Sequence, residues 1–469
     1  MRDLGLVFVV LFAVASDAAA QDWPTYAHDM ARTASTPAPL ARALVPAWTW
    51  TSDIPPQPAW GGPAKWDAYS KIHDLKPRLG FDAAFHPAIV DGRVYFGSSS
   101  DDQLHCLDAK TGKELWSAFA DAPIRVGPTV VRGRVLFGSD DGRVYCVAAR
   151  TGKVHWTRQL APDDRRIVGN GRMVSVWPVR TGVGTFGELA YACAGLFPAE
   201  GSYLCALRIA DGSIVWRQQF QDLPPQGPIL VSSTRLYVPT GRGNPVVFER
   251  KTGKKLFNVG GRGGTYALLT GDVLVSGPGK TGQLTVHPQA ADTLATFQGN
   301  RMIVRRETSW LLADAELSAL DRTRYLALAK ERRDLGGTQR GLKNRLKNLG
   351  KPDKKGQKPD PAKVAVEKKK IRRDLLKVGS RIDAAGKEMA ACQRWKVGSE
   401  HPLSMALAKD VLVCGGIGEV VLRDAGRGSV LGTLPVVGKA YGIAIADGRL
   451  FVSTDQGHVH CFVAKGAKR

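Results

Sequence analysis

Residues 108–116 (DAKTGKELW) decide the fold of this chain, because three further segments repeat their pattern. The repeats are residues 148–156 (AARTGKVHW), 208–216 (RIADGSIVW) and 249–257 (ERKTGKKLF). Each contains the end of a strand, a tight turn at Thr-Gly or Asp-Gly, and a second strand with one large aromatic residue. The copies start 40, 60 and 41 residues apart. Strand repeats near 40 residues are typical of an all-β propeller with one four-stranded blade per period.

Strand patterns around these turns predict eight blades, with seven as the alternative count. In the sixth blade, residues 317–321 (LSALD) match the strand before the turn, but the aromatic strand follows only at residues 393–397 (QRWKV). The eighth unit, residues 441–463, lacks an outer strand, and residues 44–50 (LVPAWTW) supply one from the N-terminus. A terminal strand that completes the last blade would close the ring and remove open sheet edges.

The repeated aromatic residues are predicted to be structural. Each indole offers a large flat surface to bury against a neighbouring sheet, while the turn glycine takes the positive φ that other residues resist. The predicted docking residues are Trp116, Trp156, Trp216 and Trp395. Cys106 and Cys146 both lie ten residues before such a tryptophan, so they are interpreted as small core residues that leave room for it.

Residues 322–390 interrupt the sixth blade with a helical period. Apolar residues follow heptad spacing at Leu335, Leu342, Leu346 and Leu349, and again at Val364, Ile371, Leu375, Val378 and Ile382. The Pro/Gly/Lys-rich residues 350–361 between them predict an antiparallel coiled-coil hairpin, each arm about 40 Å long. Residues 321–390 hold 22 Lys/Arg against 9 Asp/Glu. The first interpretation of this charge is a solubilised coiled coil; the second is a basic arm that engages an anionic envelope component or a protein partner.

The N-terminus is typical of an exported protein. A short polar start, an apolar run too short to span a bilayer, and small residues before Gln21 predict a signal peptide at residues 1–20. The mature chain would then contain a propeller at residues 21–321 and 391–469, with residues 322–390 inserted. We expect a periplasmic or secreted protein without a membrane-spanning segment. The net charge of +23 among 469 residues would allow nucleic acid as a partner, but export argues against it.

The seven cysteines suggest few disulfides. Cys193 and Cys205 flank the turn at residues 198–201 almost symmetrically, so they would face each other across a hairpin. A cross-strand disulfide between them is one interpretation, and two free buried thiols are the other. No Cys-x-x-Cys motif and no adjacent cysteine pair is present.

The turn motif, with Ala-x-Asp-x-x-x-Gly-Lys-x-x-Trp as its ideal form, resembles the tryptophan-docking repeat of quinoprotein-type (PQQ-like) propellers. Residues 108–116 and 319–321 carry it best, and residues 22–29 (DWPTYAHD) resemble the first segment of the mature chain in that family. The resemblance covers the mature chain except for the insertion. It implies one of two functions: dehydrogenation with pyrroloquinoline quinone and calcium, or non-enzymatic assistance in outer-membrane assembly.

The non-enzymatic branch is the closer match. The dehydrogenases carry a vicinal disulfide and a calcium site of carboxylate and amide oxygens, and neither pattern is evident here. We therefore predict an exported binding or scaffolding protein, without catalytic residues, metal ligands or cofactor. A PQQ-dependent oxidoreductase with calcium is the alternative. The chain also departs from the assembly-factor branch, because it lacks a lipid-attachment cysteine and carries the helical insertion.

Residues just before each inner strand should ring one mouth of the central channel. The candidate ligand-binding residues are His86, Arg125, Trp177, Arg180, His401, Lys439 and Tyr441, with Gln226 and Arg301 at equivalent positions. One hypothesis is that this basic and aromatic rim binds an anionic ligand or an acidic peptide. The other is that these are ordinary rim residues, solvated or paired with carboxylates.

Overall fold

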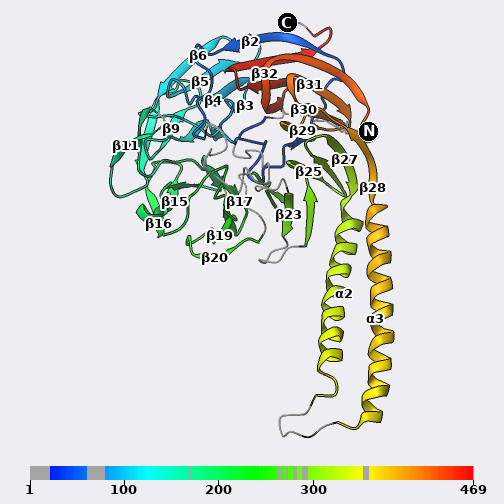
Figure 1. The fold of residues 1–469 in the computed structure, drawn as a ribbon. Coiled ribbons are helices and arrows are strands. Elements are labelled where there is room, and N and C mark those ends of the chain that lie inside the picture. Colours follow the sequence, from blue (N-terminus) through cyan, green and yellow to red (C-terminus); the bar gives the residue numbers. More distant parts are fainter. Residues whose placement is uncertain are drawn as a thin grey trace, which may run out of the picture.

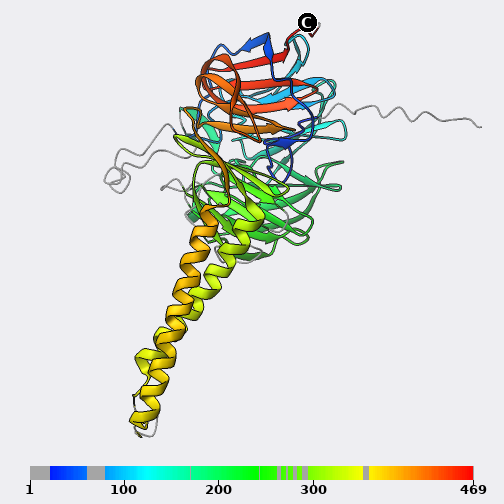
Figure 2. The same cartoon turned by 90° about the vertical axis from the view of Figure 1, so that its right-hand side faces the viewer.

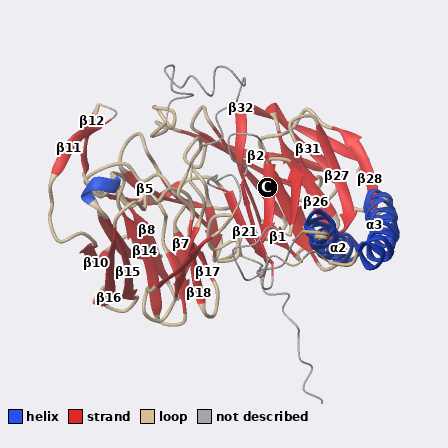
Figure 3. Cartoon of the chain, turned by 60° about the horizontal axis from the view of Figure 1, so that its bottom comes forward, coloured by secondary structure: helices blue, strands red, loops and turns tan. Residues whose placement is uncertain are grey.

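A computed structural model of the chain describes residues 22–60, 80–169, 171–241, 243–260, 266–270, 273–277, 283–287, 294–351, 357 and 359–467. The predicted signal peptide lies outside the described residues. The sheets form a ring from which two helices project (Figure 1). Except for one short 3-10 turn, η1 (Pro198–Glu200), all helical residues of the described ranges belong to that pair of helices (Figure 3).

Most strands belong to six antiparallel four-stranded sheets that resemble propeller blades. Each sheet is a meander in chain order, as expected for strands joined by tight turns. Their strands are β3 (Ala88–Val90), β4 (Arg93–Gly97), β5 (Gln103–Asp108) and β6 (Glu114–Phe119); β7 (Thr129–Val131), β8 (Arg134–Gly138), β9 (Arg143–Ala148) and β10 (Val154–Gln159); β13 (Gly184–Phe186), β14 (Leu189–Ala194), β15 (Ser202–Arg208) and β16 (Ile214–Phe220); β17 (Leu230–Val231), β18 (Arg235–Val238), β19 (Val246–Glu249) and β20 (Lys255–Asn258); β21 (Tyr266–Thr270), β22 (Val273–Gly277), β23 (Gln283–His287) and β24 (Ala295–Gln298); β25 (Arg301–Arg305), β26 (Thr308–Leu312), β27 (Glu316–Asp321) and β28 (Gln393–Gly398).

The remaining large sheet has eight strands in the order β1-β29-β30-β31-β32-β33-β34-β2. These are β1 (Ser35–Thr36), β2 (Leu44–Thr51), β29 (Ser404–Ala408), β30 (Val411–Gly415), β31 (Ile417–Asp424), β32 (Val430–Ala446), β33 (Arg449–Thr454) and β34 (His458–Ala464). The long β32 pairs with β31 through its first half and with β33 through its second. A separate two-stranded ribbon, β11 (Arg166–Gly169) and β12 (Arg172–Ser175), precedes β13.

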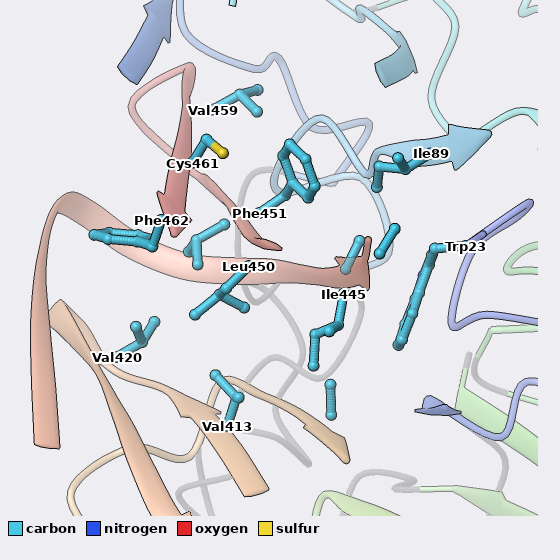
Figure 4. Packing of buried hydrophobic residues seen from close by; sticks show 14 of the residues in the cluster. Trp23, Ile89, Val413, Val420, Ile445, Leu450, Phe451, Val459, Cys461 and Phe462 are labelled. Carbon is cyan, nitrogen blue, oxygen red and sulfur yellow. The ribbon is translucent and has the colours of Figure 1, made fainter. Parts of the chain in front are cut away.

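The N-terminal strand closes the ring, as the sequence predicts. β2 pairs antiparallel with β34, with Leu44 opposite Ala464 and Thr51 opposite His458. The seam beside it is a large apolar cluster that joins the two ends of the chain (Figure 4). Trp23 and Ile89 from the start of the chain lie in this cluster with Phe451 and Phe462 from its end, all at most 2% exposed. Burial of about 25 cal/mol per Å² of apolar surface makes this seam a major source of stability.

The repeated tryptophans join each sheet to the next. Each stands opposite a small residue across its own sheet: Trp48 opposite Cys461, Trp116 opposite Cys106, Trp156 opposite Cys146, Trp216 opposite Ala206 and Trp395 opposite Ala319. Each indole also covers a turn glycine of the following sheet. The indole atoms lie so close that a Cβ built on Gly112, Gly152, Gly212, Gly253 or Gly428 would be 2.5–2.7 Å from them. These glycines have φ of +70° to +73°, so both the backbone and the covering ring require glycine.

The sixth four-stranded sheet contains the helical insertion. β27 ends at Asp321, α2 (Arg322–Asn348) and α3 (Pro361–Ala390) follow, and β28 then returns to pair with β27. The two helices run side by side away from the ring (Figures 1 and 2). The predicted heptad residues lie on the less exposed face of each helix, and Ile371 is fully buried. No helix in the described ranges has an apolar stretch long enough to cross a membrane.

Of the two interpretations of Cys193 and Cys205, the disulfide is wrong and the pair of free buried thiols agrees with the structure. The register places Cys193 opposite Leu204 and Cys205 opposite Ala192. The two cysteines are therefore one position out of register, so their side chains point to opposite faces of the sheet. Cys193 packs toward the β17–β20 sheet and Cys205 toward the β7–β10 sheet, and both thiols are free. Burial raises the pKa of Cys205 to about 12, which leaves the thiol protonated and unreactive.

Candidate functional site

The centre of the ring is occupied by residues 22–36, which we call the plug segment (Figure 1). Its backbone bonds to the inner strands of five sheets in chain order, over N–O distances of 2.7–3.1 Å. The contacts are Trp23 with Ile89, Pro24 with Val130, Met30 with Val231, Ala31 with Leu269 and Ala34 with Leu407. Beyond them, β1 adds a parallel strand to β29. The plug segment thus crosses five sheets and fills the space that a propeller leaves open as a channel.

Arg32 holds the plug segment in place. Its side chain is 2% exposed, and its guanidinium donates to the carbonyl of Ile229 at 2.8 and 3.2 Å and to that of Tyr26 at 2.9 Å. Burial lowers the pKa of Arg32 to about 10, so the group stays charged at neutral pH. A buried cation that binds carbonyl oxygens on both the plug and a sheet fixes one against the other.

Two of the predicted rim arginines belong to a buried ionic cluster. Arg125 bonds to Asp140 at 2.6 Å and to Asp82 at 3.2 Å, while Arg180 bonds to Asp140 through two nitrogens at 2.8 Å. The four side chains are at most 4% exposed. Two positive and two negative charges therefore balance at this mouth of the ring, as buried charges require.

The pKa values of the two aspartates in this cluster shift in opposite directions. Burial raises the pKa of Asp82 and outweighs the attraction of Arg125. Burial opposes ionisation of Asp140 too, but Arg180 and Arg125 together hold its pKa below the usual range. Asp140, which contacts both arginines, is therefore the aspartate whose ionised form the cluster favours most.

Residues 57–60, which we call the cover segment, lie across the same mouth. Arg125 donates to the carbonyl of Gln57 at 2.5 Å, and the amide of Ala59 donates to Asp82 at 2.7 Å. The indole N–H of Trp60 reaches the side-chain oxygen of Gln226 at 2.6 Å. The two arginines that would attract an anion are thus paired with aspartates, and the cover segment lies over them.

The other predicted rim residues fall into two groups. His401 bonds to Glu419 at 2.9 Å, Lys439 lies 3.9 Å from Asp455, and the indole N–H of Trp177 bonds to the carbonyl of Glu200 at 3.0 Å. His86 and Tyr441, in contrast, line one cavity together with Arg301. The structure therefore brings two of the seven rim residues together around a common space.

That cavity has a volume of about 40 Å³ and is bounded by the plug segment. Tyr26 of the plug packs edge-on against His86, with ring centroids 4.8 Å apart. His86 is 6% exposed, and its Nε2 has no hydrogen-bond partner in the described part of the chain. Burial, and then the positive charge of Arg301, lower its pKa to about 4, so the imidazole is neutral at pH 7.

Sequence reasoning missed the carboxylates of the mouth. Asp82 precedes the first sheet and Asp140 lies in the loop between β8 and β9, so neither is at the start of an inner strand. A signal was present, since antiparallel pairing brings the loop between the second and third strands to the end of the sheet where the first strand begins. The acidic turn Ser139-Asp140-Asp141-Gly142 was therefore a candidate for this mouth.

The quinone and calcium implied by one branch of the resemblance do not fit these residues. The cavity is lined by Trp23, Tyr26, Ala27, Ala34, His86, Pro87, Arg301, Ile303, Ser404, Met405, Tyr441 and Ile443, with no carboxylate or amide side chain among them. Calcium requires six to eight oxygen ligands. Sites for organic cofactors are roughly 300 Å³ or larger, several times the volume of this central cavity. Across the described ranges, no group of three His, Cys, Asp or Glu side chains is placed to bind a metal.

Comparison with known proteins identifies the repeat. Residues 49–201 match the family described as outer membrane protein assembly factor BamB. The chain is 28% identical over 258 residues to a 1-butanol dehydrogenase (cytochrome c) of Thauera butanivorans, covering 50% of this chain and 33% of that one. It is 32% identical over 115 residues to the dehydrogenase subunit of a quinone alcohol dehydrogenase of Gluconobacter oxydans, covering 22% and 15%. The chain thus spans a third or less of the length of these curated relatives.

Two solved structures share the fold over nearly the whole chain. BamB of Moraxella catarrhalis superposes with a TM-score of 0.52 at 11% identity, covering 91% of this chain and 99% of that one. A quinohemoprotein alcohol dehydrogenase of Comamonas testosteroni superposes with a TM-score of 0.59 at 15% identity, covering 96% and 81%. At such identities the likeness is one of fold, which both branches of function share.

Proposed function

Because this chain is a PQQ-like propeller-repeat protein, we propose that it is an exported, non-enzymatic binding or scaffolding protein with eight blades. Six blades are the four-stranded sheets. The other two share the eight-stranded sheet, since β32 serves as the outer strand of one and the inner strand of the next. On this proposal the mature chain starts at residue 21, the propeller comprises residues 21–321 and 391–469, and residues 322–390 form a coiled-coil arm.

The observation that carries this proposal is the filled centre of the ring. Dehydrogenation by a bound quinone needs a cavity that admits both cofactor and substrate, whereas the plug segment crosses the inner strands of five sheets. At the mouth, Arg125 and Arg180 pair with Asp140 and Asp82, and the cover segment lies over them. A charge-balanced core whose central cavity measures only about 40 Å³ in the described part of the chain suits a scaffold whose partners bind its outer surfaces and arm.

The proposed partners are a protein or an anionic component of the cell envelope, met in the periplasm or outside the cell. The family described as an outer membrane assembly factor supports protein partners. The hypothesis of an anionic ligand at the rim stays a prediction, now confined to His86 and Tyr441, because Arg125 and Arg180 are paired with aspartates.

A second candidate function is quinone-dependent alcohol oxidation, which the two curated relatives favour. Pyrroloquinoline quinone would supply two-electron oxidation of an alcohol if it were bound. The cavity lining offers it a guanidinium, an imidazole and a phenol, but no carboxylate. We therefore assign no catalytic residue for this reaction.

Reconstitution separates the two candidates. The purified mature chain is incubated with excess pyrroloquinoline quinone and Ca²⁺, gel-filtered, and assayed for a bound chromophore and for dye reduction with primary alcohols. The binding function predicts no retained chromophore and no turnover above the cofactor alone. Stoichiometric retention with alcohol-dependent dye reduction would overturn it. A quinohemoprotein dehydrogenase treated in the same way is the positive control.

A further inference from the structure

The outward face of α3 carries exposed cations together with exposed apolar residues. Residues three or four apart share one face of a helix, and this spacing links Val366, Lys369, Lys370, Arg373, Leu376 and Lys377, which we call the α3 stripe. All six are exposed, and the two apolar members are among the most exposed large hydrophobic residues of the described chain, Val366 at 71% and Leu376 at 73%. One acidic residue, the partly buried Asp374, lies beside the stripe between Lys370 and Lys377.

Packing of the hairpin does not explain this stripe. The seam against α2 uses the other face of α3, where Ile371 is 1% exposed and Leu375 and Val378 are partly buried. Figures 1 and 2 show the hairpin extending away from the ring, so the sheets do not cover the outer part of α3 either. Among the residues that the structure describes, Val366 and Leu376 are therefore left largely uncovered.

Three acidic residues of the hairpin, Glu331, Glu367 and Glu388, pair with arginines outside the stripe. Glu367 pairs with Arg345 at 2.7 Å, and Glu331 takes two hydrogen bonds from Arg381, at 2.6 and 2.7 Å. The four cations of the stripe form no ion pair or hydrogen bond within the described residues. Across both helices, 18 Lys/Arg stand against 6 Asp/Glu, so the positive field of the stripe is not cancelled along the arm.

We propose that the α3 stripe docks onto an anionic lipid surface. The proposal rests on the binding function above and names its partner. Each Lys or Arg near such a surface adds attraction, and sparse apolar side chains insert at the headgroup boundary. A specific protein partner would instead need roughly 1,000 Å² or more of complementary surface with an apolar core. Two apolar side chains about 15 Å apart on a convex helix do not provide such a core, whereas lipid headgroups conform to any convex face.

Vesicle flotation tests the proposal on the full mature chain. Vesicles of phosphatidylcholine with about 30 mol% phosphatidylglycerol are compared with pure phosphatidylcholine at about 100 mM salt, where screening is moderate. The wild type should float with the anionic vesicles and not with the neutral ones. The variant Lys369→Glu/Arg373→Glu/Lys377→Glu should lose at least about tenfold in partition coefficient. Val366→Ser/Leu376→Ser should bind more weakly and be released at lower salt.

A matched control carries the same charge change on the propeller. Lys110, Lys251 and Lys254 are exposed turn residues, and Lys110→Glu/Lys251→Glu/Lys254→Glu should partition within about twofold of the wild type. Circular dichroism verifies that each variant is folded. Equal flotation of the stripe and control variants would overturn the proposal, as would wild type that binds neutral vesicles equally well. Binding to soluble polyglutamate without flotation would instead assign the stripe to an acidic protein. Cofactor retention does not involve the arm, so either proposal can fail alone.

Discussion

The contact between a tryptophan and a turn glycine is the unit from which the ring is built. In each case the indole lies over a glycine of the next sheet, and its own strand bulges beside it so that the ring can reach across. Three of these indoles also donate their N–H to a carbonyl in that turn region: Trp48 to Ala109, Trp156 to Ile209 and Trp395 to Ala425. One residue type thus supplies apolar contact and a directed hydrogen bond together.

Replacement of Gly152 measures the contribution of this close packing. Gly152 has φ +71° with Trp116 at 2.5 Å from a built Cβ, whereas Gly133 has φ +70° and open space around it. Gly133→Ala should cost about 1 kcal/mol for the backbone alone. Gly152→Ala should cost about 1–3 kcal/mol more, since the added methyl overpacks the site. Urea unfolding measures the loss of unfolding free energy in each variant. Equal losses would mean that the indole of Trp116 moves aside at no energetic cost.

His86 should make stability depend on pH. Its pKa is about 4 in the folded protein and near 6.5 when unfolded. Its contribution is therefore complete above pH 6.5 and is lost as the pH falls toward 4, by about 3 kcal/mol in total. Urea titrations at pH 7 and pH 4.5 should show a smaller difference for His86→Gln than for wild type. The exposed His155, replaced by Gln, serves as control. If His86→Gln lost as much unfolding free energy between pH 7 and pH 4.5 as the wild type does, His86 would not be the source of this pH dependence.

The turn aspartate shows how a helix can start within a blade. Asp108 accepts a hydrogen bond from the amide of Thr111 at 2.8 Å, and Asp424 from that of Arg427 at 3.0 Å. Asp321 occupies the same place before α2 and accepts from the amide of Arg324 at 3.1 Å. The bond that stabilises a tight turn elsewhere is here the N-cap of a helix. The insertion therefore keeps the local geometry of the sheet that it interrupts.

The hairpin has a packed base and a free outer part. At the base, Leu328, Ala329 and Ala385 are buried, and Ala329 packs against residues of β21–β25. Farther out, Gln339 and Gly379 lie across from each other, 3.9 Å from side-chain nitrogen to a built Cβ. A deletion that joins these two residues would remove the α3 stripe and leave the base intact.

Two deletions are expected to differ in stability. Removing residues 340–378 with a short Gly-Ser link should leave the thermal midpoint within a few degrees of the wild type, because no buried contact with the sheets is lost. Removing residues 322–390 should lower the unfolding free energy by about 2 kcal/mol or more, since the apolar contacts at the base are uncovered. Calorimetry measures the stability of each variant. An equal and large loss of stability in both would show that the outer part of the hairpin stabilises the sheets.

Closure of the ring depends on Trp48 of β2. Its indole covers Gly112 and donates to Ala109, so it connects the last sheet to the first. Trp48→Ala should cost about 3–5 kcal/mol and should promote self-association by loosening a sheet edge. Trp60→Ala, at a site 43% exposed, should cost about 1 kcal/mol. Denaturation measures the stability of the two variants, and light scattering measures their self-association. A monomeric Trp48→Ala variant of near-normal stability would contradict the role of Trp48 in ring closure.

The sequence predicted the repeating parts of the molecule well and the irregular parts poorly. The pairing of β27 with β28 across the insertion and of β2 with β34 is confirmed, because periodic apolar residues and turn glycines determine strand order. The expectation that Cys193 and Cys205 face each other was wrong, because a register shift of one residue reverses the face of a side chain. The carboxylates beside Arg125 and the plug segment follow from contacts between distant residues, which no local pattern encodes.

The pairing of the two chain ends also constrains the order of folding. Leu44 meets Ala464, and the residues that bond to the plug segment extend from Ile89 to Leu407. β2 has no partner strand until β34 is available, the last contact of the plug segment needs β29, and contacts of such long range are slow to form. Intermediates with unpaired edges are prone to aggregate. Folding of this protein should therefore be cooperative and should require β34. A truncated chain that lacks β34 should form no partly closed ring.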